Sequence, residues 1–259
     1  MVQEDGGRGR TPVQAELGEI AVELADAAGS LLLEVRQGGL AGAALREAGD
    51  RVSHEFLVSE LARRCPGDAV LSEEGRDDLA RLAASRVWIV DPLDGTREFS
   101  EPPRWDWAVH VALVVDGELT VGAVALPARG LSFHTSEPPS LSPMQSGVAR
   151  MLVSRTRAPG WATDVARGLG AEIVQMGSAG AKAMAVVLGE AEIYVHAGGQ
   201  YEWDSAAPVA IARAAGLHVS RLDGSSLRYN QPDPWLPDLL ICRREIAATA
   251  LELCRRWCE

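Results

Sequence analysis

Two aspartates stand close together at the end of an apolar run, in the sequence Trp-Ile-Val-Asp-Pro-Leu-Asp-Gly-Thr at residues 88–96. A turn at this point would bring the carboxylates of Asp91 and Asp94 and the carbonyl of Leu93 around one centre. An all-oxygen set of this kind suits a hard divalent cation such as Mg²⁺ better than Zn²⁺ or Cu²⁺. The stretch therefore predicts a magnesium site, and the alternative is an ordinary surface turn with Asp91 as a cap.

The two residues that follow Asp94 could bind phosphate. Gly95 lets the backbone come close to a ligand. If a helix begins here, the backbone N–H groups of Gly95 and Thr96 point outward, and such groups bind phosphate well. We therefore expect a cation and a phosphate group to meet at this point of the chain.

A second pair of acids, Glu73 and Glu74, follows the short apolar strand predicted at 69–71. Adjacent acids at the end of a strand usually belong to a solvated loop. Here the strand predicted at 87–90 also ends in acids, and two neighbouring strands that end in this way would place their carboxylates together. We expect Glu73 to face the site.

Two pieces of the second half could reach the same centre. The turn Gly-Ser-Ala-Gly at 177–180 lies between a predicted strand and a predicted helix, where it can approach a ligand or simply turn the chain. Asp204 lies in the first turn of another predicted helix, where an acid is a favourable cap. If Asp204 instead reaches Asp91 and Asp94, the site gains a fourth carboxylate and can hold more than one cation.

These residues permit direct hydrolysis of a phosphate ester. A bound cation lowers the pKa of water, and a carboxylate such as Glu73 beside a hydroxyl such as Thr96 can take the proton. A second cation would neutralise charge on the leaving oxygen, so no covalent intermediate is required. The scattered histidines form no Ser-His or Cys-His pair. Trp105, Trp107 or Tyr201 could stack an adenine, although aromatic residues near strands are more often packed.

The composition limits the partners. The chain of 259 residues has a formal charge of −11, which argues against binding to a nucleic-acid polymer. A small anionic substrate is compatible with this charge if bound cations reverse it locally. The first residues show no apolar signal-peptide core, no window approaches 18 uninterrupted apolar residues, and the four cysteines form no CxxC pair. We expect a cytoplasmic protein with no membrane partner.

Two helices are expected at the start of the chain. Apolar residues at intervals of three and four predict a long helix over 13–35, which ends at the glycine pair 38–39. Residues 38–49 hold four glycines and predict a mobile flap over the site rather than a packed element. Asp50 follows this flap, where it either caps a second helix or takes part in catalysis.

The remainder of the first half predicts an antiparallel sheet. The apolar runs 107–115 and 119–126 flank the sequence Asp-Gly-Glu, which is a strong signal for a hairpin. Residues 136–147 are then rich in proline and serine, which is typical of a boundary. We therefore predict two subdomains, residues 1–145 with the metal motifs and residues 146–259 completing the site.

The second half alternates strands and helices, a pattern that favours a mixed or parallel sheet between helix layers. Strands are expected at 150–154, 172–175, 192–195, 217–222 and 239–242, and helices at 161–168, 181–188, 206–215 and 245–257. The fold class is therefore α+β or α/β, with an antiparallel sheet in the first half and a mixed sheet in the second.

The order of these motifs resembles that of the inositol monophosphatase superfamily of Mg²⁺-dependent, Li⁺-sensitive phosphomonoesterases. The resemblance extends from about Val13 to the C-terminus. It rests on Glu-Glu at 73–74, Asp-Pro-Leu-Asp-Gly-Thr at 91–96, Gly-Ser at 177–178 and Trp-Asp-Ser-Ala-Ala at 203–207. It implies a layered αβαβα sandwich, two or three Mg²⁺ ions per site, and a homodimer.

Three further stretches resemble the CysQ-like branch of that superfamily, actinobacterial members especially. They are Gly-Ser-Ala-Gly-Ala-Lys-Ala at 177–183, the run 194–204 and Arg-Tyr-Asn at 228–230. The implied activity is removal of the 3′-phosphate from adenosine 3′,5′-bisphosphate, with 3′-phosphoadenylyl sulfate as a further substrate, in sulfate assimilation. The alternatives are hydrolysis of inositol monophosphates or of fructose 1,6-bisphosphate. An alternative of another class is a non-catalytic metal or nucleotide sensor.

The resemblance also implies roles for individual residues. Glu73, Asp91 and the Leu93 carbonyl would hold one Mg²⁺, and Asp91, Asp94 and Asp204 would hold a second. The residues expected to contact substrate are Glu73, Leu93, Asp94, Gly95, Thr96, Gly177, Ser178 and Asp204.

The catalytic residues implied by the resemblance are Glu73, Thr96 and Asp50. Glu73 and Thr96 would position the attacking water, and Asp50 would polarise the Thr96 hydroxyl. The chain departs from its relatives just before Asp50, where it reads Leu-Arg-Glu-Ala-Gly with no lysine in place of a longer loop that carries one.

Overall fold

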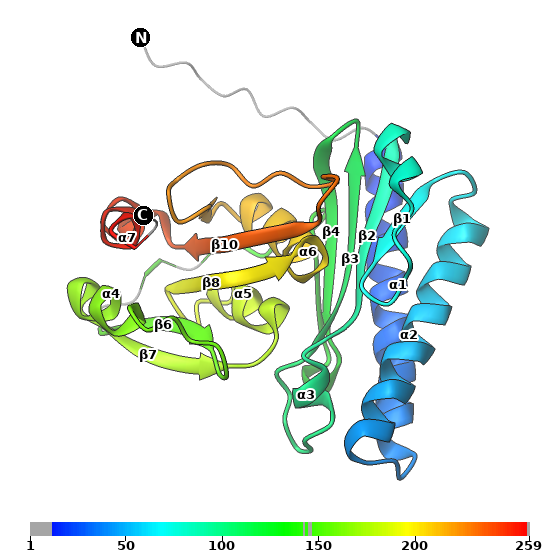
Figure 1. Cartoon of the computed structure of the whole chain (residues 1–259), viewed down its shortest axis with the longest axis horizontal. Coiled ribbons are helices and arrows are strands. Elements are labelled where there is room, and N and C mark those ends of the chain that lie inside the picture. Colours follow the sequence, from blue (N-terminus) through cyan, green and yellow to red (C-terminus); the bar gives the residue numbers. More distant parts are fainter. Residues whose placement is uncertain (1–11, 142, 145–146, 258–259) are drawn as a thin grey trace.

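The computed structural model describes residues 12–141, 143–144 and 147–257. Five layers succeed one another across the molecule in Figure 1, namely a helix pair, a five-stranded sheet, a middle helix layer, a second five-stranded sheet and an outer helix layer. The predicted αβαβα sandwich is therefore confirmed.

The first sheet has the strand order β1-β2-β3-β4-β5. Its strands are β1 (Ala69–Ser72), β2 (Arg86–Asp94), β3 (Ala108–Val115), β4 (Glu118–Leu126) and β5 (Leu131–His134). From β2 to β5 the neighbours are antiparallel, as predicted. β1 is a correction, because it pairs with β2 in parallel and makes the sheet mixed. The connection between them is a crossover that contains the 3₁₀ helix Leu79–Ala83 rather than a tight hairpin.

The first helix layer consists of α1 (Pro12–Gln37) and α2 (Gly42–Arg64), which cover the outer face of the first sheet in Figure 1. α1 agrees with its prediction. The flap predicted at 38–49 is wrong, because residues 42–49 form the first two turns of α2 and Leu45 in them is buried. Asp50 therefore lies inside α2, and the prediction that it caps this helix is wrong as well.

Gly49 is buried in α2 because the helix packs very closely on the end of β2 and on α3. A Cβ atom at this position would lie 2.8 Å from Cε1 of Phe99 and 2.9 Å from Cδ2 of Leu93. The glycine that suggested mobility in the sequence thus allows close packing. The consequence is that Asp50, the next residue, is brought up to the turn that follows β2.

The second sheet has the strand order β7-β6-β8-β10-β9. Its strands are β6 (Ala149–Ser154), β7 (Ala171–Met176), β8 (Ile193–Tyr201), β9 (His218–Ser220) and β10 (Trp235–Cys242). β6 runs parallel to β7 and β8, whereas β10 runs antiparallel to β8 and β9. The predicted mixed sheet is confirmed.

The remaining helices cover the second sheet on both faces. α5 (Ala179–Val187) and α6 (Glu202–Ala214) form the middle layer and contact strands of both sheets. α4 (Ala162–Leu169) and α7 (Arg244–Arg255) lie on the outer face in Figure 1. The short α3 (Thr96–Phe99) follows β2 directly. Because α5 and α6 begin at ends of β7 and β8, their first turns lie beside the carboxylates that end β2.

The largest group of buried apolar side chains is shared by the two sheets, since it joins Ile89 and Val124 of the first sheet to Met184, Ile211 and Ile241. The division into subdomains 1–145 and 146–259 stays a prediction, and the predicted boundary lies partly outside the described residues. Among the helices described, none combines the length and the apolar character that a membrane span requires. The described cysteines Cys65, Cys242 and Cys254 are buried, and Cys258 lies outside the described residues.

Candidate active site

The parallel pairing of β1 and β2 brings the first two acids together. Ser72 lies opposite Val90, and the backbone N–H of Glu73 donates to the Val90 carbonyl at 3.4 Å. Glu73 thus follows the end of β1 next to the point where Asp91 follows Val90. This is the juxtaposition that two neighbouring strands ending in acids predict.

β2 does not stop at Pro92, as the sequence predicted, but bulges there. Asp91 lies opposite His110 and Asp94 lies opposite Ala108, so β2 carries one more residue than β3 between these pairs. The backbone N–H of Leu93 donates to Asp91 Oδ1 at 3.1 Å, which closes a turn around the proline. The bulge directs both carboxylates into the same space.

Asp204 reaches this space from the middle helix layer. Its Oδ2 accepts a hydrogen bond from the Tyr201 N–H at 2.6 Å at the start of α6, so it does cap the helix. Carboxylate oxygens of Asp91, Asp94 and Asp204 also lie within 4.8 Å of one another. The two functions weighed in the sequence therefore coexist in one side chain. Glu73 and all three aspartates line one cavity of about 620 Å³.

The clustered acids raise one another's pKa. The pKa of Glu73 rises to about 7, first because surrounding protein desolvates it and then because Asp204 is negative. Burial likewise raises the pKa of Asp204 to about 6, with Asp94 adding to the shift. The pKa of the fully buried Asp91 is raised by burial and by the charges of Glu73 and Asp94. Removing these carboxylates from water is unfavourable unless a cation compensates them.

Asp94 has a different environment, because it is surrounded by donors. Its Oδ2 accepts from Ser178 Oγ at 2.5 Å and from the Gly180 N–H at 2.7 Å, and His110 Nε2 lies 3.2 Å away. Burial by itself would raise the pKa of Asp94, but His110, Lys182 and Ser178 outweigh it and lower the pKa. Asp94 therefore stays negative while its neighbours resist ionisation.

His110 is held between Asp94 and α6. Its Nδ1 lies 3.0 Å from the Trp203 carbonyl, to which the protonated nitrogen donates. Burial lowers the pKa of His110, but the hydrogen bond and negative charge of Asp94 exceed this effect and raise it overall. The imidazole links the end of β2 to the first turn of α6, where Asp204 lies.

Thr96 lies at the start of α3, within reach of the groups predicted to orient it. Its hydroxyl donates to the Leu93 carbonyl at 3.0 Å and lies 3.4 Å from Asp50 Oδ1. Gly95 before it has a φ of 87° and leaves space for Ser178, whose Cβ would lie 3.1 Å from an added Cβ. The pKa of Asp50 is raised to about 6 by burial and by Glu74.

The turn at 177–180 is held by hydrogen bonds from Lys182 and to Asp106. The buried Lys182 Nζ donates to the carbonyls of Ser178 at 2.6 Å and Gly177 at 3.1 Å, and burial lowers its pKa to about 8. The Gly177 N–H donates to Asp106 Oδ2 at 2.7 Å. Ser178 adopts a φ of 47°, which is uncommon for a residue with a side chain. The strained turn presents Ser178 to Asp94 and lines the cavity.

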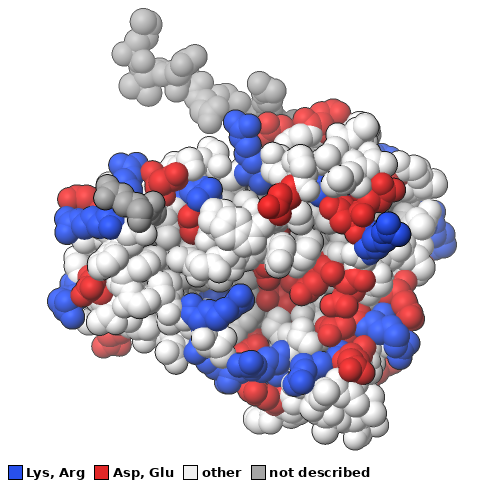
Figure 2. Space-filling view, in the orientation of Figure 1, with Lys and Arg blue, Asp and Glu red and all other residues white. Residues whose placement is uncertain are grey.

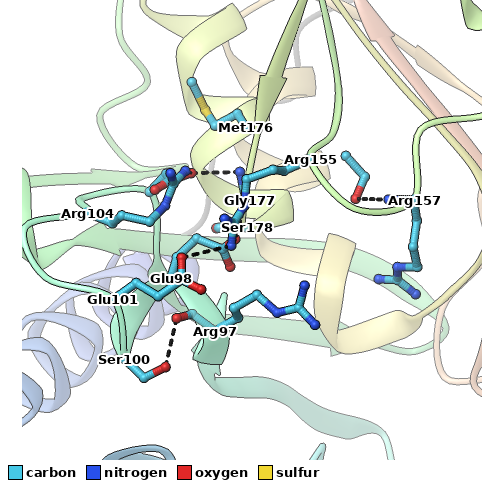
Figure 3. Close-up of polar contacts among 12 residues, drawn as sticks. Arg97, Glu98, Ser100, Glu101, Arg104, Arg155, Arg157, Met176, Gly177 and Ser178 are labelled. Atoms are coloured by element: carbon cyan, nitrogen blue, oxygen red, sulfur yellow. Dashed lines mark hydrogen bonds and ion pairs between the residues drawn. The ribbon is translucent and has the colours of Figure 1, made fainter. Parts of the chain in front are cut away.

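The opposite side of the cavity is basic. Arg97, Arg155 and Arg157 line it together with Lys182. In Figure 3 Arg155 lies beside the turn at 177–180, whereas Arg97 from α3 and Arg157 from the segment after β6 extend into the space next to it. Figure 2 shows acidic side chains gathered near the middle of this face, with basic side chains beside and below them. One end of the cavity thus carries carboxylates that can bind cations, and the other carries basic side chains that can bind an anion.

The aromatic residues considered for adenine stacking do not line this cavity. Trp107 is fully buried against Phe99, with ring centroids 5.1 Å apart. Trp105 is exposed beneath Arg129, and Tyr201 stacks on Trp203 with centroids 4.7 Å apart. The ring that does line the cavity belongs to Tyr194 on β8.

Several residues in or beside the cavity were not given a role from the sequence. His110 and Lys182 lie inside apolar runs, where a lone polar residue gives no local signal, and only the pairing of β2 with β3 places His110 beside the acids. Arg97 could have been found from the sequence, because it directly follows the Asp-Gly-Thr motif. Arg157 stands in a loop after β6, and no periodicity marks it.

The arrangement fits a hard divalent cation. Asp91 Oδ2 is buried and has no hydrogen-bond partner among the described residues. Carboxylate oxygens of Asp91, Asp94 and Asp204, which come from two separate elements, lie within 4.8 Å of one another. A fourth carboxylate, that of Glu73, lines the same cavity. All donors are oxygen atoms, which favours Mg²⁺ over softer metals. The site can therefore bring a metal ion and an anionic ligand together.

Comparison with known proteins agrees with this chemistry. The model of the inositol monophosphatase family matches residues 13–256. The 3′-phosphoadenosine 5′-phosphate phosphatase of Mycobacterium leprae is 53% identical over 258 residues, covering 93% of this chain and 95% of its own. The protein of the same name from Mycobacterium tuberculosis is 54% identical over 234 residues, covering 86% and 88%.

A solved structure agrees as well. CysQ from Bacteroides thetaiotaomicron, described as a bacterial member of the inositol monophosphatase family, has a TM-score of 0.76 and 26% identity to this chain. The match covers 89% of this chain and 98% of the other.

Proposed function

Because this chain belongs to the inositol monophosphatase family, we propose that it is a phosphomonoesterase that hydrolyses the 3′-phosphate of adenosine 3′,5′-bisphosphate. 3′-Phosphoadenylyl sulfate is the proposed second substrate. The observation that carries the proposal is the convergence of Asp91, Asp94 and Asp204 beside Glu73 in one cavity with a basic side. Mycobacterial relatives named for this activity match nearly the whole chain, which supports the choice of substrate.

We assign the metal site to Glu73, Asp91, Asp94, Asp204 and the Leu93 carbonyl. Two or three Mg²⁺ ions per site would be held by these oxygen atoms. When bound, Mg²⁺ makes water more acidic and neutralises negative charge on the phosphate group and the leaving oxygen. The unpartnered Asp91 Oδ2 and the raised pKa of its neighbours support the assignment.

The side chains around the cations orient the reacting groups. In the reaction the oxygen of water bonds to phosphorus, the bond from phosphorus to the 3′ oxygen breaks, and that oxygen gains a proton. Glu73 and Thr96 position the water, since both line the cavity, and the Glu73 carboxylate accepts its proton. Asp50 acts on the Thr96 hydroxyl, 3.4 Å away. Gly95, Thr96, Gly177 and Ser178 contact the phosphate group.

The wider setting follows from the same proposal. We propose a cytoplasmic protein in sulfate assimilation, inhibited by Li⁺ and assembled as a homodimer. Its partner is a small phosphate ester, not a nucleic-acid polymer or a membrane. The net charge of −11 supports the exclusion of nucleic acid.

Phosphate release from several esters in parallel tests the proposal. The panel comprises adenosine 3′,5′-bisphosphate, 3′-phosphoadenylyl sulfate, inositol 1-phosphate and fructose 1,6-bisphosphate, each with and without Mg²⁺ and Li⁺. We expect Mg²⁺-dependent turnover with the highest kcat/KM for adenosine 3′,5′-bisphosphate. A higher kcat/KM for inositol 1-phosphate or fructose 1,6-bisphosphate would overturn the substrate. Binding without turnover of any ester would indicate a sensor.

A further inference from the structure

Two arginines in the wall of the cavity have side chains with no partner among the described residues. Arg97 follows Thr96 in α3, and Arg157 lies in the loop after β6. Neither guanidinium makes a hydrogen bond, an ion pair or a ring contact with the residues that the structure describes. In Figure 3 the two guanidinium groups point toward the same open space from opposite sides. Their hydrogen-bond donors are free for a ligand.

Arg155 lines the same cavity but is paired with acidic residues of the protein. Its Nη2 lies 2.6 Å from Glu98 Oε1 and 3.1 Å from Glu101 Oε2, so its charge is neutralised within the protein. Glu98 in turn packs against Gly177, where a Cβ would lie 2.3 Å from Glu98 Cδ. Arg155 therefore supports the turn at 177–180, whereas Arg97 and Arg157 support nothing in the fold.

The cavity extends from the acids toward β8, so a ligand must fill more than the metal site. Gln200 is only 4% exposed and lines the cavity, yet neither its Oε1 nor its Nε2 has a partner among the described residues. Buried amides are normally paired. The buried Tyr194 hydroxyl is also unpartnered. These groups point to a bound molecule that continues past the scissile phosphate.

The charge of Arg157 acts inside this space. Burial is the largest cause of the pKa shifts of Asp204 and His196, and the positive charge of Arg157 contributes by lowering the pKa of each. Arg157 lines the same cavity as Asp204 at the metal-binding end and Gln200 on β8. Once cations neutralise the acids, the free arginines are left to balance a second negative group on the ligand.

We propose that Arg97 and Arg157 form a second anion subsite that binds the 5′-phosphate of adenosine 3′,5′-bisphosphate. The inference rests on the proposed function and names the residues that select a substrate with a second phosphate group. With the 3′-phosphate at the acids, the ribose and its 5′-phosphate extend into the open space that the two guanidinium groups face. Guanidinium forks bind a phosphate dianion through paired, charge-assisted hydrogen bonds. The subsite therefore selects nucleotides with two phosphates over those with one.

A comparison of two substrates tests the subsite. Adenosine 3′,5′-bisphosphate and adenosine 3′-monophosphate carry the same scissile phosphate, and only the first carries the 5′-phosphate. The ratio of their kcat/KM values is measured for the wild type, Arg97→Met, Arg157→Met and the double variant. We expect this ratio to fall about tenfold or more in each single variant. The kcat/KM for adenosine 3′-monophosphate should fall by a clearly smaller factor, because this nucleotide carries no 5′-phosphate.

Two controls make the test specific. Arg213→Met removes an exposed arginine that lines a different cavity, and it should leave the ratio unchanged. The lysine variants Arg97→Lys and Arg157→Lys keep a positive charge and should restore part of the lost preference. The thermal unfolding midpoint of the Arg97 and Arg157 variants should equal that of the wild type, because neither side chain has a partner in the part of the chain that the structure describes.

The outcomes separate the inference from the function on which it rests. An unchanged ratio in Arg97→Met and Arg157→Met, or an equal loss for both substrates, would overturn the subsite while leaving the phosphatase proposal intact. A wild-type protein that hydrolyses neither nucleotide would overturn the proposed function, and the subsite with it.

Discussion

Gly180 lies so close to His110 that a Cβ atom on the glycine would be 2.1 Å from Nε2 of the imidazole. The same glycine donates its N–H to Asp94 Oδ2, the oxygen that His110 faces at 3.2 Å. One small residue thus allows a histidine, an aspartate and the first turn of α5 to meet.

This contact predicts the effect of Gly180→Ala. The added methyl group has to displace His110 from Asp94, since the backbone of α5 cannot withdraw without breaking its own contacts. We expect a loss of about 1–3 kcal/mol in the free energy of unfolding, typical of overpacking, and a lower kcat. Denaturant unfolding and phosphate release measure the two effects. Gly160→Ala is the control, because an added Cβ there meets nothing within 4 Å. Equal behaviour of the two variants would show that the contact does not matter.

Thr96 and Asp50 are predicted to act as a unit. Thr96→Val removes the hydroxyl that bonds to Leu93 and faces Asp50, and we expect it to lower kcat by about 10²–10⁴-fold, the usual range for a proton-transfer group. Asp50→Asn should cost less.

If Asp50 acts only through the Thr96 hydroxyl, the double variant should be no slower than Thr96→Val alone. A double-mutant cycle on kcat checks this. Additive losses would mean that Asp50 has a separate function. Thr96→Ser serves as the control, because it keeps a hydroxyl at the same position.

The pKa shifts predict how Mg²⁺ changes stability with pH. Burial and like charge raise the pKa of Glu73 to about 7 and of Asp204 to about 6, above the ordinary carboxyl range. Without metal, their contribution to stability is complete below the ordinary carboxyl pKa and is lost as pH rises through about 6 to 7. Mg²⁺ binds the ionised carboxylates, so the gain in stability on adding Mg²⁺ should be larger at high pH than at low pH.

The thermal unfolding midpoint measures this effect. The increase on adding saturating Mg²⁺ should be larger at about pH 8 than at about pH 5.5, where protons compete for the same oxygens. Asp91→Asn, which removes a central carboxylate, should abolish the increase at both values. An increase that is independent of pH would contradict the assignment of these acids as ligands.

Much of this site could be anticipated because its signals are local. Acids at the ends of two predicted strands, a small-residue turn before a helix and an acid opening another helix can each be recognised over a few residues. The structure places Glu73, Asp91, Asp94 and Asp204 along one cavity. The β bulge at Pro92 could not be predicted from the local sequence, because a bulge depends on the partner strand.

The errors have a common physical cause. Four glycines in residues 38–49 suggested a flap, but Gly49 packs against Leu93 and Phe99, residues far from it in sequence. The benefit of that contact exceeds the modest helix-breaking tendency of glycine. His110 and Lys182 were overlooked for the same reason, because their importance arises from partners on other elements. Tertiary contacts of this kind produce no periodic pattern in the sequence.

The most direct test of the metal assignment is the Mg²⁺ dependence of phosphate release from adenosine 3′,5′-bisphosphate by Asp94→Asn. We predict that turnover falls by more than about 100-fold while circular dichroism shows a native fold, because a carboxylate that holds the cation is lost. Calorimetry should show weakened Mg²⁺ binding in the same variant. Near-normal turnover at the wild-type Mg²⁺ concentration would contradict the claim that these buried acids bind the catalytic metal.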